Sequence, residues 1–308
     1  MVDLSTKLGE LELAAPVLTA SGCAAAGKEL SRFFDLNAIG GVVTKSIMLE
    51  PRSGRPTPRT IETPSGMLNS IGLQGHGLDH FLEVDLPWLR ERGVNTVVSI
   101  AGNDVQEFGT IANRLRDVPG IAGVEVNISC PNVANRGLVF ACQPDSAADV
   151  VAATRRHFGP RMPLFAKLSP DVTSIVEIAK SVADAGASGV SVINTLLGMA
   201  IDHKTLRPYL GGRTGGLSGP AVRPVAVRAV YQIRAALPQL PILGMGGIRS
   251  GIDALEFFAA GANAVSVGTA IFADPTAPLR IQTELANELE TRGIARLSDV
   301  IGIAHEEL

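Results

Sequence analysis

Aromatic side chains and long apolar runs are scarce in this chain of 308 residues. Aromatic residues make up 4% of it, which argues against a surface that stacks nucleic-acid bases. The net charge of −3 gives no basic footprint for a nucleic acid either. There is no run of about 18 apolar residues to cross a membrane and no N-terminal signal-peptide pattern. We therefore expect a protein with neither a nucleic-acid nor a membrane partner.

Cysteine is also rare. Cys23, Cys130 and Cys142 are an odd number, widely spaced, and form no CxxC pair, which excludes a disulfide framework, a zinc finger and an iron–sulfur motif. Free cysteines of this kind are typical of the reducing cytoplasm, which is the predicted location. Hydrophobic residues make up 46% of the chain and charged residues 19%, so a folded protein with a sizeable core is expected.

Short apolar segments alternate with helical patterns along the whole chain. Runs of this length indicate strands buried on both faces, as in a parallel sheet. The predicted strands are 16–21, 41–46, 96–101, 123–129, 163–169, 189–195, 241–247 and 264–270, and helices are predicted at 104–117, 146–158, 172–185, 221–236 and 251–260. Eight strands with crossover helices predict a (β/α)8 TIM barrel, with a doubly wound sheet as the alternative. No change in composition divides the chain, so residues 1–308 are expected to form one domain.

Two segments, 47–77 and 196–219, are too long to be simple connections. Long loops in a compact domain are usually lids or binding loops. Both follow predicted strands, and in a barrel the segments after the strands form the catalytic face. We expect both to be long active-site loops on that face.

Small, polar or cationic residues stand at the carboxyl ends of all eight predicted strands. Chemistry in such a barrel takes place at those ends. They read Ala20-Ser21-Gly22, Lys45-Ser46, Ser99, Asn127-Ile128-Ser129-Cys130, Lys167, Asn194-Thr195, Gly246-Gly247 and Gly268-Thr269. The alternative is that polar residues stand there only because strand ends are exposed to solvent. The repetition over eight strands favours a site.

The turns after the last two strands, GMGGIRSG (244–251) and VGTAIF (267–272), are rich in glycine. Barrels often bind a phosphate there, because glycine lets backbone N–H groups approach it closely. Tight turn geometry alone would also explain each glycine pair. The two turns together predict a phosphorylated cofactor or substrate.

Lys45 and Lys167 end otherwise apolar strands, where an ammonium group can balance a carboxylate, a phosphate or a reduced ring. The alternative for each lysine is a purely structural role at the barrel rim, where its charge is balanced by a salt bridge. The side-chain amides of four asparagines can donate and accept, and so read a heterocycle with amide or imide edges; they are Asn69, Asn127, Asn132 and Asn194. An isolated asparagine is more often a turn or cap residue.

Cys130 lies in NISCPN (127–132), where a strand runs into a loop that Pro131 keeps extended. A thiol on a catalytic rim can act as a nucleophile or a general base, although a lone cysteine is more often inert. Its place at a strand end favours a catalytic role, whereas Cys23 and Cys142 are interpreted as packing residues. His76 and His80 show no metal-binding spacing, and no metal is predicted.

These motifs resemble the class 1 dihydroorotate dehydrogenases, flavin enzymes of pyrimidine synthesis. The resemblance runs through the chain in LTASG (18–22), VTKS (43–46), NSIGLQG (69–75), VNISCPN (126–132), KLSPD (167–171), INT (193–195), GGLSGPA (215–221), GMGGI (244–248) and VGTA (267–270). The cysteine within NISCPN is typical of class 1, since the membrane-associated class 2 enzymes have serine there. The resemblance therefore implies a (β/α)8 barrel that carries FMN.

The resemblance also implies the site residues. FMN would be held by Ser21, Lys45, Ser46, Ser99, Asn127, Lys167, Ile193, Gly219, Gly246, Gly247, Gly268 and Thr269. Dihydroorotate or orotate would lie against Lys45, Asn69, Ser70, Ile71, Gly72, Leu73, Asn127, Asn132, Asn194 and Thr195. Cys130 would remove the C5 proton of dihydroorotate while hydride passes from C6 to the flavin.

The segments IGLQG (71–75) and VDLPWL (84–89) are most similar to the NAD-linked branch, class 1B. Its catalytic subunit forms a homodimer core and pairs with a second chain that carries FAD and a [2Fe–2S] cluster, giving a heterotetramer. The chain departs from that branch at Gly75-His76, where Asn-Pro is common, and at Ser99, where Asn is common. Two alternatives stay open: a related FMN barrel acting on another dihydropyrimidine, and a flavin-free barrel that is a lyase or a binding subunit.

Overall fold

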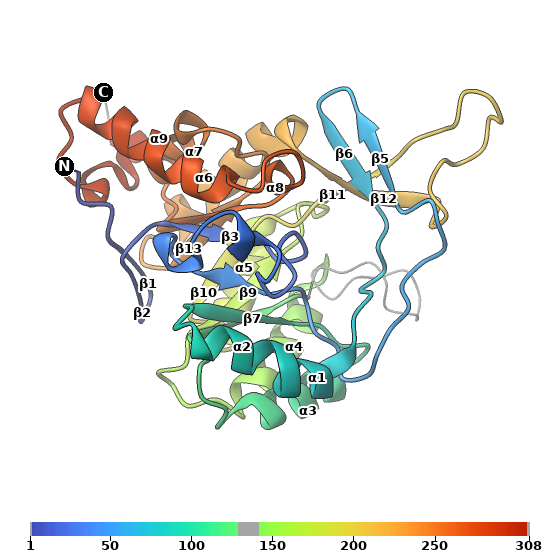
Figure 1. Ribbon diagram of the computed structural model, residues 1–308. Helices are drawn as coiled ribbons and strands as arrows, with labels where there is room; N and C mark the ends of the chain where they lie inside the picture. Colours follow the sequence, from blue (N-terminus) through green and yellow to red (C-terminus); the bar gives the residue numbers. More distant parts are fainter. Residues whose placement is uncertain (1, 129–141, 307–308) are drawn as a thin grey trace.

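Eight parallel strands form the central sheet of the computed structural model, which describes residues 2–128 and 142–306 (Figure 1). Their order in the sheet is β3-β14-β13-β10-β9-β8-β7-β4. The strands are β3 (Val17–Thr19), β4 (Val42–Val43), β7 (Thr96–Ile100), β8 (Gly123–Val126), β9 (Leu164–Leu168), β10 (Gly189–Val192), β13 (Ile242–Met245) and β14 (Ala264–Val267). Each lies inside one of the eight predicted segments, so those predictions are confirmed.

The two edge strands, β3 and β4, meet and close the sheet. A parallel bridge joins Leu18 to Gly41, just before β4. The backbone N–H of Gly40 donates to the carbonyl of Val17 over 2.7 Å, and that of Thr19 donates to the carbonyl of Gly41 over 3.2 Å. The structure is therefore a (β/α)8 barrel, as predicted, and the doubly wound alternative is wrong.

Helices cover the outside of the barrel, and the five predicted helices are confirmed. Three of them begin at side-chain N-caps: Asp104 accepts from the N–H of Glu107, Ser174 accepts from the N–H of Glu177, and Ser250 forms a capping box with Asp253. The helices are α1 (Gly77–His80), α2 (Leu86–Glu91), α3 (Val105–Leu115), α4 (Pro144–Arg155), α5 (Ile175–Asp184), α6 (Arg223–Ala236), α7 (Gly251–Ala259), α8 (Ala270–Ala273) and α9 (Ala277–Thr291), with a π-helical turn η3 (Phe81–Asp85) between α1 and α2. No helix in the described part of the chain is long and apolar enough to span a membrane.

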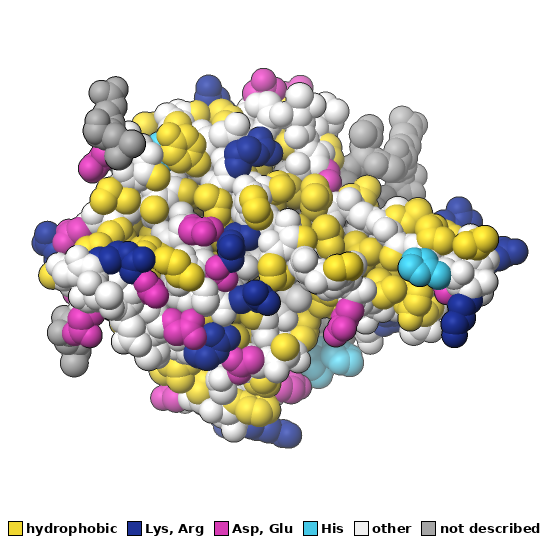
Figure 2. Space-filling view, turned by 90° about the horizontal axis from the view of Figure 1, so that it is seen from above, with side chains coloured by type: hydrophobic (Ala, Val, Ile, Leu, Met, Phe, Trp, Pro, Cys, Tyr) yellow, Lys and Arg dark blue, Asp and Glu magenta, His cyan; other side chains and the backbone are white. Residues whose placement is uncertain are grey.

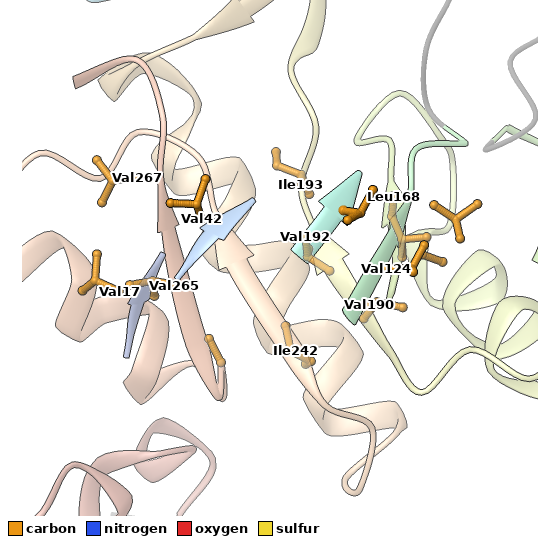
Figure 3. Packing of buried hydrophobic residues seen from close by; sticks show 14 of the residues in the cluster. Val17, Val42, Val124, Leu168, Val190, Val192, Ile193, Ile242, Val265 and Val267 are labelled. Atoms are coloured by element: carbon orange, nitrogen blue, oxygen red, sulfur yellow. The ribbon is translucent and has the colours of Figure 1, made fainter. Parts of the chain in front are cut away.

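The strands bury side chains on both faces, as their near-continuous apolar sequences require. Outward residues such as Val124, Val190 and Val265 pack in the core shared with the helices (Figure 3). Inward residues of the lower barrel, including Leu18 and Phe165, pack in a separate core with the N-terminal hairpin of β1 (Thr6–Leu8) and β2 (Leu11–Leu13). Apolar packing thus fills the amino-terminal end of the barrel, which leaves the carboxyl end for polar groups.

The two long segments were expected to be loops, and this expectation is wrong in part. They pair with each other in a four-stranded antiparallel sheet of order β11-β12-β6-β5, at the upper right of Figure 1. Its strands are β5 (Thr60–Thr63), β6 (Gly66–Asn69), β11 (Leu196–Met199) and β12 (Thr214–Ser218). Because the segments follow the carboxyl ends of β4 and β10, this sheet belongs to the face on which barrel chemistry takes place.

The two ends of the chain lie together. The N–H of Asp3 donates to the carbonyl of Ala295, and the N–H of Leu297 donates to the carbonyl of Asp3, each over 2.9 Å. Seen from above, the surface carries cationic and anionic side chains interspersed with apolar ones (Figure 2).

Candidate active site

The predicted polar residues at the strand ends form one hydrogen-bonded group. Oγ of Ser46 lies 3.2 Å from Oγ of Ser21 and 2.9 Å from Oγ of Ser99. The side-chain amide of Asn127 donates to the same Ser46 oxygen over 2.9 Å. Ser46 therefore joins the ends of β3, β4, β7 and β8, and four of the predicted cofactor residues are brought together.

Glu125 is a site residue that the sequence reasoning missed. It lies in β8, fully buried, and its Oε1 accepts a hydrogen bond from Oγ of Ser99 over 3.1 Å. Nζ of Lys167 lies 3.6 Å from the same oxygen. The second oxygen, Oε2, has no hydrogen-bond partner among the described residues. A signal was available in the sequence, because GVEV places one charged residue in an otherwise apolar buried strand.

Both predicted lysines lie near Cys23, which was interpreted as a packing residue only. Burial raises the pKa of the Cys23 thiol to about 11, and the positive charges of Lys167 and Lys45 oppose that rise. The Sγ atom would lie 3.3 Å from a Cβ placed on Gly268. Cys23 therefore stands between the two cationic strand ends and the predicted phosphate turn.

The glycine turns after β13 and β14 meet the end of β12. Gly246 and Gly247 have φ angles of +128° and +78°, and a Cβ on Gly247 would lie 2.7 Å from the carbonyl oxygen of Gly219. Oγ1 of Thr269 donates to Oγ of Ser218 over 2.7 Å. Turn geometry alone thus requires glycine at 246 and 247.

Backbone donors of these turns are left for a ligand. Within the described residues, the N–H groups of Gly247, Gly268 and Thr269 donate no backbone hydrogen bond outside the helices and strands. Donors of this kind, close together on neighbouring turns, suit a phosphate group.

The predicted substrate residues lie where the two long segments pair. Asn69 ends β6, is in register with Gly216 of β12, and donates from Nδ2 to the Gly216 carbonyl over 3.2 Å. A Cβ on Gly216 would lie 2.0 Å from Oγ1 of Thr195, so Thr195 packs against the same strand. Oδ1 of Asn194 accepts from the N–H of Thr195 over 2.9 Å. Asn69, Asn194 and Thr195 are therefore brought to one place.

The other predicted substrate residues form the turn after β6. Ser70 is buried, and its N–H donates to the carbonyl of Arg59 over 2.7 Å. The carbonyl of Ile71 accepts from the N–H of Arg55 over 3.0 Å, while Gly72 has a φ of +80°. Leu73 packs with Met48 and Ala101 in a small apolar cluster. The turn is thus anchored to the barrel rather than free.

Two predicted residues, Cys130 and Asn132, fall within 129–141 and lie outside the described residues. Ile193 follows β10, and its Cγ1 atom would lie 3.6 Å from a Cβ on Gly246. No group of three or more His, Cys, Asp or Glu residues in the described part of the chain is arranged to hold a metal ion. His80, for which the sequence showed no carboxylate partner, has Asp85 Oδ2 at 4.0 Å from its Nε2.

The barrel interior has polar atoms that its own side chains do not satisfy. Ser191 and Ser266 alternate with outward-facing valines, so they point inward with Glu125. Their hydroxyl oxygens, like Oε2 of Glu125, are buried without a hydrogen-bond partner among the described residues. Together with two cations, an amide and unused backbone N–H groups, this donor and acceptor set fits a flavin mononucleotide, which carries a phosphate and a polar ring edge.

The chain is similar over nearly its whole length to proteins of one family. Residues 3–289 match the family described as Dihydroorotate dehydrogenase. The chain is 50% identical over 304 residues to the dihydroorotate dehydrogenase B (NAD(+)) catalytic subunit of Desulforamulus reducens, covering 99% of each chain. It is 49% identical over 300 residues to the protein of the same name from Pelobacter propionicus, covering 97% of this chain and 98% of that one. The chain belongs to the dihydroorotate dehydrogenase family, as its motifs indicated.

Proposed function

We propose that this protein is the catalytic subunit of an NAD-linked dihydroorotate dehydrogenase, which oxidises dihydroorotate to orotate in pyrimidine biosynthesis. The observation that carries the proposal is the joining of four strand ends through Ser46, next to a lysine and unused backbone donors. The names of its relatives support the same activity.

FMN is the cofactor that these residues would hold. The N–H groups of Gly247, Gly268 and Thr269, with Gly246 and Gly219 shaping their turns, would bind its phosphate. The ring would lie against Ser21, Lys45, Ser46, Ser99, Asn127, Lys167 and Ile193. When bound, FMN supplies the hydride acceptor that no side chain can provide.

The chain's own residues would bind and orient the substrate. Lys45 would balance the negative charge of the dihydroorotate carboxylate, and the amides of Asn69, Asn127, Asn132 and Asn194 would read the ring edges. Thr195 and the anchored turn Ser70-Ile71-Gly72-Leu73 would lie against the ring and exclude water from it. Cys130 would take the proton from C5, acting as a general base.

A partner chain is part of the proposal, because the relatives are named as catalytic subunits. No CxxC or other cysteine cluster in this sequence can bind an iron–sulfur centre. Electron transfer to NAD would therefore need a second subunit with FAD and a [2Fe–2S] cluster, joined to a homodimer of this chain.

The test is anaerobic mixing of the purified protein with dihydroorotate. We expect a yellow protein with about one FMN per chain, whose flavin absorbance is bleached by dihydroorotate. Reoxidation by NAD is expected only after co-expression with the partner subunit, and fumarate should not replace it. A colourless protein that binds no FMN would favour a flavin-free barrel. Bleaching by another dihydropyrimidine but not by dihydroorotate would favour a related flavin enzyme.

A further inference from the structure

Glu125 is a carboxylate enclosed within the barrel, on β8. Its neighbours Val124 and Val126 pack outward against the helices, so its side chain points into the barrel. Oε1 accepts from Ser99 over 3.1 Å and lies 3.6 Å from Nζ of Lys167. Lys167 is almost as deeply buried, with 5% of its side chain exposed. The two charges thus form an ion pair away from solvent.

Stability does not explain this pair. Taking two charges out of water is costly, and the attraction between them offsets the cost only when the geometry is good and the other polar atoms are satisfied. Here the separation exceeds the 2.7–2.9 Å of a strong charge-assisted hydrogen bond. The other oxygen of Glu125 has no partner among the described residues. Apolar side chains of similar volume would give a fold at least as stable. The buried pair therefore points to a role in the site.

The positive charges of the two lysines near the site indicate what this role is. Lys45 and Lys167 both act on the Cys23 thiol, so both cations lie near the same part of the barrel mouth. Lys167 without a counter-charge would stabilise an anionic reduced flavin strongly and oppose the return of its electrons to an acceptor. A carboxylate beside one of the cations reduces this effect.

We propose that Glu125 is a positioning residue, which orients Lys167 and moderates the positive charge that Lys167 presents to the flavin. The site then favours reduction without preventing reoxidation. This inference rests on the proposed function, since it requires bound FMN.

The test is the midpoint potential of FMN in the intact protein, measured against a reference dye. Glu125→Gln keeps the shape and an acceptor oxygen but removes the charge. We expect it to shift the reduction equilibrium about tenfold toward reduced flavin, which is about 30 mV for a two-electron couple. Ser99→Ala keeps the carboxylate but removes a hydrogen-bond donor to it. The reduction equilibrium should therefore shift the other way, about threefold toward oxidised flavin.

The matched control is Thr154→Val, which removes a buried hydroxyl that donates to the carbonyl of Val150 within α4, away from the strand ends. It should leave the potential unchanged. An unchanged or lower potential in Glu125→Gln would overturn the inference. Shifts of the same sign in Glu125→Gln and Ser99→Ala would also overturn it. If Glu125→Gln retains no flavin, Ser99→Ala decides, and an unchanged potential in it overturns the inference. A wild-type protein without flavin would overturn the proposed function as well. A wild-type protein bleached by dihydroorotate, with no shift in the variants, would overturn this inference alone.

Discussion

The side-chain amide of Asn127 donates to Oγ of Ser46 over 2.9 Å, although 81 positions separate the two residues. Their strands, β8 and β4, are not neighbours in the sheet, because β7 lies between them. The bond therefore reaches past the end of β7, and Ser99 of β7 shares the same hydroxyl. One small side chain thus holds together several predicted cofactor residues.

Ser46→Ala should weaken FMN binding about tenfold, or ~1.4 kcal/mol, because it removes the hydroxyl that Asn127, Ser99 and Ser21 share. Fluorescence titration of the apoprotein with FMN measures this. The control is Ser31→Ala, whose exposed hydroxyl bonds only to the carbonyl of Lys28. Equal FMN affinity in the two variants would show that the Ser46 hydroxyl does not organise the site.

Cys130→Ala should keep bound FMN but slow its reduction by dihydroorotate by about 10²–10⁴-fold, the usual contribution of a general base. Anaerobic stopped-flow mixing at neutral pH measures the rate. Cys142→Ala is the matched control and should react at the wild-type rate. An unchanged rate in Cys130→Ala would remove this thiol from the mechanism.

Cys23 should make the stability of the protein fall at alkaline pH. Burial raises the pKa of its thiol to about 11 in the folded protein, whereas the pKa of an exposed thiol is 9.0. Between these values the unfolded chain loses its proton first, so the free energy of unfolding falls as the pH rises. Denaturant unfolding should show Cys23→Ala losing about 1.4 kcal/mol less than the wild type between pH 8 and pH 10. Parallel losses in the two proteins would contradict this.

Arg155 should contribute to stability and not to FMN binding. It donates to the carbonyls of Gly186, Met162 and Gly159 over 2.8, 2.9 and 3.1 Å and to Oγ of Ser188 over 2.8 Å. Burial lowers the pKa of its guanidinium group. Because Arg155→Met leaves several acceptors unpaired, we expect a loss of about 2–4 kcal/mol in denaturant unfolding.

The matched control is Arg114→Met, which removes an arginine paired with Asp79 on the surface at 2.7 Å. An exposed pair of this kind contributes about 0–1 kcal/mol. A similar loss in the two variants would mean that the buried contacts of Arg155 add nothing, and a change in FMN affinity would contradict its purely structural role.

The eight strands and the barrel could be predicted from the sequence because each strand is a short apolar run between turn residues. Such runs report burial on both faces, which is a local property. The strand-end residues Ser46, Ser99 and Asn127 followed from the same pattern. The pairing of 47–77 with 196–219 did not, since it joins β6 to β12, which lie more than a hundred residues apart in the chain.

Glu125 and Cys23 show the same limit within the site. The sequence marks Glu125 as a charge in an apolar strand but does not identify Lys167 and Ser99 as its partners, because these lie on neighbouring strands. Cys23 carried no motif, and only burial next to two lysines distinguishes it. By itself the sequence determined the family, the strands and most of the residues at their ends, because local burial and turn chemistry leave a pattern along the chain. Only the tertiary structure decided which of these residues touch and which charges share the barrel, because those contacts depend on the closure of the sheet.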